Sequence, residues 1–128
     1  MADDLRILIE QVKAVSHPLR LRVLALLHAG ELCVCQVAEV LQVPQSSVSE
    51  ALRELRRAGF LSERKEGRWV FVSVVPSKKQ PPLLKGLLAE VADLPEVGQD
   101  RARAQQVKGL ALPIASSCLK SQTEASHA

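Results

Sequence analysis

The chain has 128 residues, of which 47% are hydrophobic and 2% aromatic, and its formal net charge is +3. This length is typical of one compact domain, and the mild basic excess permits nucleic-acid binding without establishing it. The acidic start, Met1-Ala2-Asp3-Asp4, is unlike a signal peptide, and no apolar run is long enough to cross a membrane. We therefore expect a cytoplasmic protein, in which three cysteines are buried apolar residues, metal ligands or redox thiols rather than a disulfide framework.

Apolar residues recur at helical spacing in four segments of the first half of the chain. We predict a helix over 3–15, a second from Pro18 to a stop at Gly30, and a short third over 34–41. The tripeptide 42–44 breaks the pattern. A fourth helix then runs from Pro44 to Gly59, and its buried face is formed by Val48, Ala51, Leu52 and Leu55.

The period of the pattern changes after this fourth helix. Residues 60–62 and 69–75 predict two strands, and the charged segment 64–68 between them predicts a hairpin turn with a basic tip. A linker over 76–82 leads to a last helix over 83–91, closed by Pro95. We expect a domain over 1–95 and a flexible tail over 96–128, which is thin in periodicity and ends in Ser, Gln and Thr.

Two short helices joined by a three-residue break, with a basic hairpin after them, predict a mainly α fold with one β-hairpin, the winged helix-turn-helix. The second helix of such a pair lies in the major groove of DNA. A polar face of this kind is equally common on a solvated helix, and the basic hairpin favours DNA. The candidate base and phosphate contacts are Gln45, Ser46, Ser47, Ser49, Glu50, Arg53 and Arg57 on the helix, and Arg64, Lys65 and Arg68 on the hairpin.

Five motifs follow one another between residues 14 and 75: 17–24 (HPLRLRVL), 31–35 (ELCVC), 46–49, 55–59 and 67–70. In this order and spacing they resemble the arsenical-resistance repressor (ArsR/SmtB) family. The resemblance implies a homodimer that represses a resistance operon on double-stranded operator DNA, with its interface formed by the first and last helices. The apolar stripes of residues 5–15 and 83–91 fit that interface independently, because a small domain has little else to bury them against.

The ELCVC motif matches the metalloid-sensing branch of this family residue for residue. The chain departs from the branch at Gln36, where the family often has Asp, and at Ala38, where some members have a third Cys. The resemblance implies that Cys33 and Cys35 bind trivalent arsenic or antimony as an inducer and that there is no permanent cofactor. The third ligand of the metalloid is then solvent, a small thiol or Cys118.

Physical arguments about Cys33 and Cys35 stand beside the resemblance. Thiolates select soft ions, and a helix N-terminus lowers a thiol pKa, so we expect both thiols to ionise near neutrality. Side chains two residues apart on a helix do not face each other. We therefore expect that gripping one atom unwinds or bends the start of the third helix, which conflicts with DNA-competent geometry.

Alternatives remain for the cysteines and for the whole chain. One alternative is that Cys33 and Cys35 are ordinary buried residues and that Cys118 is an incidental thiol of the tail. A redox switch would use the same pair, although a C-x-C disulfide is strained. A thiol–disulfide enzyme is another alternative, but this chain has no βαβ pattern and no Gly-rich loop, so we expect no enzyme. The basic residues argue against a protein that only binds other proteins. No zinc site is expected, since residues 83–94 hold no His and His17 reads as a helix-start residue.

Overall fold

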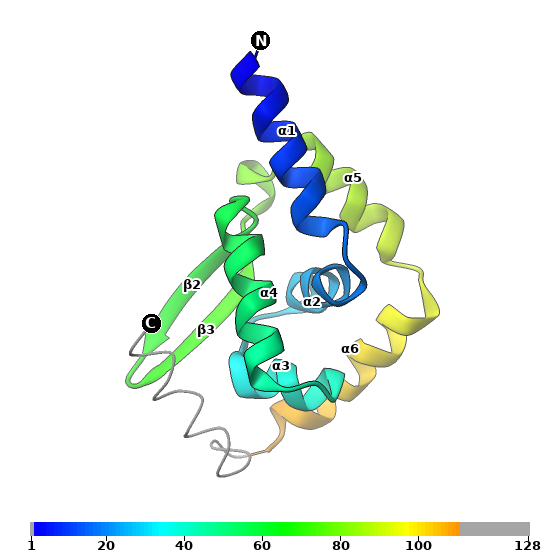
Figure 1. The fold of residues 1–128 in the computed structure, drawn as a ribbon. Coiled ribbons are helices and arrows are strands. Elements are labelled where there is room, and N and C mark those ends of the chain that lie inside the picture. Colours follow the sequence, from blue (N-terminus) through cyan, green and yellow to red (C-terminus); the bar gives the residue numbers. More distant parts are fainter. Residues whose placement is uncertain (1, 111–128) are drawn as a thin grey trace.

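The computed structural model describes residues 2–110. This part of the chain forms a winged helix-turn-helix fold (Figure 1), which confirms the predicted fold class. In chain order its elements are α1 (Ala2–Val15), α2 (Pro18–Ala29), β1 (Leu32–Cys33), α3 (Val34–Leu41), α4 (Gln45–Arg57), β2 (Leu61–Glu66), β3 (Trp69–Val74), the 3-10 helix η1 (Ser77–Lys79), α5 (Pro82–Val91) and α6 (Pro95–Lys108).

Helix α2 is the centre of the core. It begins at Pro18, whose missing N–H costs nothing in a first turn, and His17 caps it by accepting the Leu19 N–H on Nδ1 at 3.2 Å. This confirms His17 as a helix-start residue. Its middle, Val23 to Leu27, is buried on all sides, because α1, α4, α5, α6 and β3 all pack around it.

The three strands form one antiparallel sheet in the order β1-β3-β2. The β2–β3 register ends with Glu66 opposite Trp69, so the turn is the dipeptide 67–68, with Gly67 at a positive φ of 60°. The predicted first strand was too short and the predicted turn too long, since Arg64 belongs to β2 rather than to the tip. Strand β1 was not predicted, because two residues become a strand only through pairing with β3.

The turn between α3 and α4 is made by Gln42 in the left-handed conformation (φ 56°, ψ 49°). Its backbone N–H donates to the carbonyl of Ala38, and its side-chain Nε2 donates to the carbonyl of Glu39 at 2.7 Å. These bonds offset part of the cost of a conformation that suits glycine better.

The prediction of a flexible tail from residue 96 is wrong for residues 96–108, which belong to α6. Val97, Ala104 and Val107 are buried, and α6 packs against α2 and α3. The carboxylate of Asp100 accepts two hydrogen bonds from Arg22, at 2.9 and 3.1 Å. A helix that buries so few apolar residues gives a weak periodic signal, and its ion pair has a distant partner. The predicted tail beyond residue 110 lies outside the described residues.

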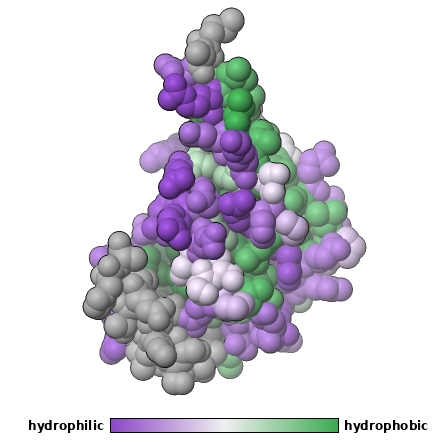
Figure 2. Space-filling view, in the orientation of Figure 1, coloured by the Kyte–Doolittle hydropathy of each residue, from purple (hydrophilic) through white to green (hydrophobic). Residues whose placement is uncertain are grey.

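The outer face of α1 is apolar and is uncovered by the described residues 2–110. Ala14 is the buried contact of this helix, whereas Leu5 is 59% and Leu8 46% exposed, with Ile9 and Val12 beside them. Figure 2 shows the corresponding hydrophobic surface along the protruding helix. On α5, Leu84, Leu88 and Val91 are buried in the core, which leaves Leu83 and Leu87 partly exposed. Among residues 2–110, no helix is both long enough and apolar enough to cross a membrane.

Candidate nucleic-acid interface and thiol site

Helix α4 is amphipathic, as its sequence predicts. Its inner face, Val48, Ala51, Leu52 and Leu55, is buried in the core. The candidate DNA-reading side chains on the other face are exposed or half-buried: Ser46, Ser47, Ser49, Glu50, Arg53 and Arg57. The arrangement presents short polar groups at the start of the helix and cations farther along it.

Gln45 differs from the other candidates on α4. Its side chain is half-buried, and its Oε1 is enclosed without a hydrogen-bond partner among the described residues. Gln45 must therefore turn outward before its amide can pair with a base edge, whereas Arg53 is already exposed. Arg57 lies 3.8 Å from Glu54 across one turn of the helix.

The hairpin of β2 and β3, here called the wing, carries the three remaining candidates. Lys65 and Arg68 are exposed at or near its tip. Arg64 lies lower on β2, where its guanidinium pairs with Glu31 at 2.6 Å and with Glu66 at 3.4 Å. Two carboxylates thus compensate the positive charge of Arg64, which the sequence predicts to contact phosphate.

The sulfur atoms of Cys33 and Cys35 are 3.1 Å apart. Cys33 is the N-cap residue of α3 and has an extended backbone (φ −87°, ψ 167°), while Cys35 lies in the first turn. The expectation that these sulfurs meet only if the helix unwinds is wrong, because the rule for residues i and i+2 applies inside a helix and Cys33 still belongs to β1.

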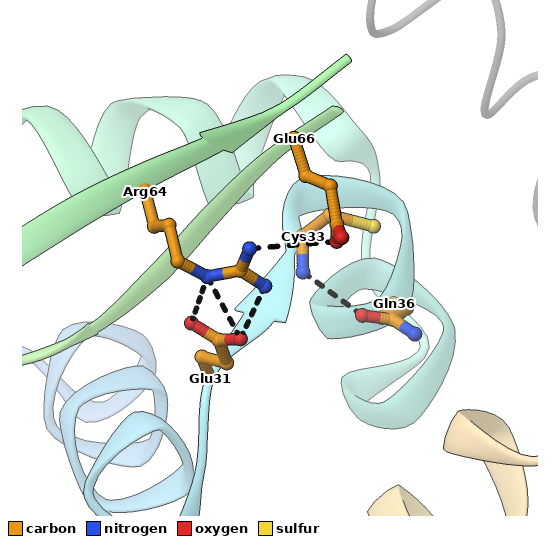
Figure 3. Close-up of polar contacts among 5 residues, drawn as sticks. All are labelled: Glu31, Cys33, Gln36, Arg64 and Glu66. Carbon is orange, nitrogen blue, oxygen red and sulfur yellow. Dashed lines mark hydrogen bonds and ion pairs between the residues drawn. The ribbon is translucent and has the colours of Figure 1, made fainter. Parts of the chain in front are cut away.

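The same segment is held by a capping arrangement. The backbone N–H of Cys33 donates to Oε1 of the buried Gln36 side chain at 2.9 Å, as Figure 3 shows. Backbone N–H groups of Gln36 and Cys35 interact in turn with the Cys33 sulfur and lower its pKa. The Gln36 amide thus accepts the Cys33 N–H without placing a carboxylate charge beside the Cys33 sulfur.

Burial governs the chemistry of Cys33 more than the helix end does. Cys33 is 0% and Cys35 3% exposed. Removal from water raises the pKa of Cys33 by more than the surrounding N–H groups lower it. The expectation of a thiol ionised near neutrality is therefore wrong for Cys33, because desolvation exceeds the helix-end effect.

The cover over the sulfurs is the wing itself. Trp69 and Phe71 of β3 pack against both cysteines, and Phe71 lies directly opposite Cys33 in the β1–β3 register. Sequence reasoning missed both residues, because their contact with the cysteines depends on a strand pairing between distant segments. In the sequence, Trp69 stood out only as part of an apolar strand and of the 67–70 motif.

A third ligand is not built into the described residues. Within residues 2–110 no group of three or more His, Cys, Asp or Glu side chains is arranged to hold a metal ion. Cys118 lies outside the described residues. The site as described is a pair of buried cysteines beside an apolar aromatic wall.

Comparison with known proteins gives the same kind of molecule. Residues 17–63 match the family described as "Bacterial regulatory protein, arsR family". A helix-turn-helix transcriptional regulator of Methanocaldococcus jannaschii is 40% identical over 70 residues, 54% of this chain and 79% of the relative. An arsenic resistance transcriptional regulator of Pseudomonas putida is 39% identical over 61 residues, 46% of this chain and 48% of the relative.

Among solved structures, the transcriptional regulator HlyU of Vibrio vulnificus superposes with a TM-score of 0.56 at 30% identity, over 70% of this chain and 93% of that one. The chain thus spans most of two of these three proteins but less than half of the Pseudomonas putida protein. Fold and matched family are those of transcriptional regulators, not of enzymes.

Proposed function

This chain belongs to the arsR family of bacterial regulatory proteins, and from that premise we propose that it is a repressor released from operator DNA when trivalent arsenic or antimony binds Cys33 and Cys35. The observation that carries the proposal is the 3.1 Å contact between the two sulfurs beneath the wing. It puts a soft chelating site against one of the two elements that a winged helix uses on DNA.

The proposed DNA surface combines α4 and the wing. Ser46, Ser49 and Arg53 enter the major groove, where side chains at a helix start read base edges. Lys65 and Arg68 bind phosphates beside the groove and add affinity that depends on salt. Arg64 contributes less to this charge than its position in the sequence predicts, because Glu31 and Glu66 already pair with it.

The proposed assembly is a homodimer through α1 and the exposed edge of α5. The apolar residues on the outer face of α1 have no cover in one copy of residues 2–110, and a two-fold axis lets the same face of a second copy cover them. Two copies then present two α4 helices to an operator with two half-sites.

The proposed inducer chemistry is dithiol chelation. Cys33 and Cys35 would hold the metalloid through two sulfurs that already lie 3.1 Å apart. Soft thiolates also favour such an atom over hard cations.

Solvent, a small thiol or Cys118 completes the proposed coordination. The end of α6 lies beside the segment that leads to Cys33, since a methyl group built on Gly30 would lie 2.6 Å from Lys108 Nζ. Cys118 is a candidate because it follows the helix whose end lies beside this segment.

A redox switch at the same pair is the second candidate, and the short sulfur–sulfur distance favours it as well. Oxidation would remove two thiols without adding an atom, whereas chelation adds one. Hydrogen peroxide and arsenite therefore separate the two candidates. Peroxide that releases operator DNA where arsenite does not would establish the redox function instead.

The test is titration of arsenite against operator complexes of the parent protein, the double variant Cys33→Ser, Cys35→Ser and the control Cys118→Ser. We expect the parent to lose operator affinity, the double variant to bind operator but ignore arsenite, and Cys118→Ser to respond at higher arsenite concentration at most. Full release of the double variant by arsenite would overturn the proposal, and loss of release only in Cys118→Ser would assign the sensor to that cysteine.

A further inference from the structure

One aromatic ring connects the thiol pair to the outer strand of the wing. Phe71 lies opposite Cys33 in the β1–β3 register and packs against the sulfurs. In the β2–β3 register the same residue lies opposite Arg64, whose guanidinium carbon is 4.9 Å from the ring centroid. A change at the sulfurs therefore reaches Arg64 through a single side chain.

Arg64 also ties β2 to the body of the protein. Its Nη2 donates to Glu31 Oε1 at 2.6 Å, and its Nε lies 3.2 Å from both oxygens of that carboxylate (Figure 3). Glu31 immediately precedes β1. The guanidinium thus spans from the wing to the segment that carries the cysteines.

Stability alone does not account for this contact. Partly exposed ion pairs contribute little to the free energy of unfolding, and the side chains of Arg64 and Glu31 are 49% and 41% exposed. A planar guanidinium that is both paired with a carboxylate and stacked on a ring fixes orientation, which an ammonium does not. β1 pairs with β3 through two residues only, and the ion pair of Arg56 on α4 with Glu63 on β2, at 2.8 Å, is a second polar tie. Among the described residues, the Arg64–Glu31 contact is therefore one of two ion pairs that help to set the angle of the wing.

We propose that Arg64 is a positioning residue that converts occupancy of the thiol pair into movement of the wing. Cys33 and Cys35 are 0% and 3% exposed, so an atom that binds them must displace side chains packed around them, of which Phe71 is one. Arg64 then loses the ring beneath it and its alignment with Glu31. Strand β2 leaves its DNA-competent position together with Lys65 and Arg68.

This inference rests on the proposed function, and its test separates the two. The variant is Arg64→Gln, and the matched control is Arg68→Gln, which removes the same charge from the tip of the same hairpin. Two quantities are measured with arsenite: operator affinity, and the emission of Trp69, the only tryptophan of the sequence, which packs on the cysteines. Emission reports occupancy of the thiols, and the ratio of operator affinities without and with arsenite reports transmission.

We expect a ratio of roughly 100 in the parent, within the usual range for allosteric coupling, and of about 10 or less in Arg64→Gln. The Trp69 response should saturate at the same arsenite concentration in both. Arg68→Gln should bind operator more weakly in both states and keep the parent ratio. Glu31→Gln breaks the same contact from the other side and should reproduce Arg64→Gln even if that variant folds poorly.

An unchanged ratio in both Arg64→Gln and Glu31→Gln would overturn the role of Arg64 and leave the proposed function standing. A reduced ratio together with loss of the Trp69 response would also overturn the positioning role of Arg64, because Arg64 would then act on the binding of arsenite. A parent protein whose operator affinity ignores arsenite would overturn both proposals.

Discussion

The start of α3 and the outer face of α1 both carry apolar side chains, but those at α3 are buried and those on α1 are exposed. At α3 the sulfurs of Cys33 and Cys35 are sealed beneath Trp69 and Phe71 of the wing. On α1 the large residues Leu5 and Leu8 stay about half exposed. The first region meets its partners inside one copy of the chain, so its chemistry is set by burial. The second has no cover among residues 2–110, so in the proposed dimer its contribution would depend on protein concentration.

The largest expected effect comes from a charge placed in the uncovered region. Leu8→Asp would bury a carboxylate in an apolar interface, and we expect the dimer dissociation constant to rise at least about 100-fold. Sedimentation at micromolar concentration measures this. Lys13→Asp, on the exposed polar side of the same helix, is the control and should leave the dimer intact. A parent protein that sediments as a monomer would remove α1 as an interface.

The next effect tests whether α6 belongs to the sealed part of the molecule. Asp100→Ala leaves Arg22 without its bidentate partner, and we expect a loss of about 1–3 kcal/mol in the free energy of unfolding. Urea denaturation measures it. Asp93→Ala removes the same charge from an exposed position between α5 and α6 and should change stability little. Equal stability of the two variants would mean that the Asp100–Arg22 pair adds nothing to the packing of α6 against the core.

Burial of Cys33 predicts a slow thiol whose reactivity depends on pH. Because burial raises its pKa and the thiolate is the nucleophile, the reactive fraction at pH 7 is smaller than in an exposed cysteine and grows as the pH rises toward the raised pKa. The double variant Cys35→Ser, Cys118→Ser keeps Cys33 as its one cysteine. We expect iodoacetamide to alkylate this folded variant at pH 7 at least several-fold more slowly than the same variant unfolded in urea. Equal rates would show that the wing does not seal the thiol.

The smallest effect concerns the exposed tip of the wing. Arg68→Ala should weaken binding to all DNA sequences by a few-fold and reduce the salt slope by about 1. Lys85→Ala is the control, since α5 lies on the opposite side of α2 from the wing (Figure 1). A salt slope reduced equally in both variants would point to net charge rather than to a contact at the tip.

The sequence predicts the parts of this molecule whose signal is local. Helices α1 to α5 and strand β3 follow from apolar spacing, from Pro18 at a helix start and from Gly59 after a helix end, whereas only the start of β2 was predicted. The exposed polar face of α4 follows from the same periodicity.

What escapes prediction depends on contacts between distant segments. Strand β1 exists through its pairing with β3, and α6 is held partly by the ion pair between Asp100 and Arg22. The distance between the two sulfurs was misjudged because the boundary between β1 and α3 falls between residues 33 and 34. A boundary shifted by one residue changes which geometric rule applies to Cys33.

The left-handed Gln42 between α3 and α4 bears on how a displacement would travel through the fold. A residue other than glycine has a narrow energy well there, with no neighbouring conformation of similar energy. We therefore expect the turn at Gln42 to resist a change of angle between α3 and α4, so that a displacement of α3 would move both helices together. Gln42→Gly would replace that turn with a loose hinge in which α3 could shift while α4 stayed seated.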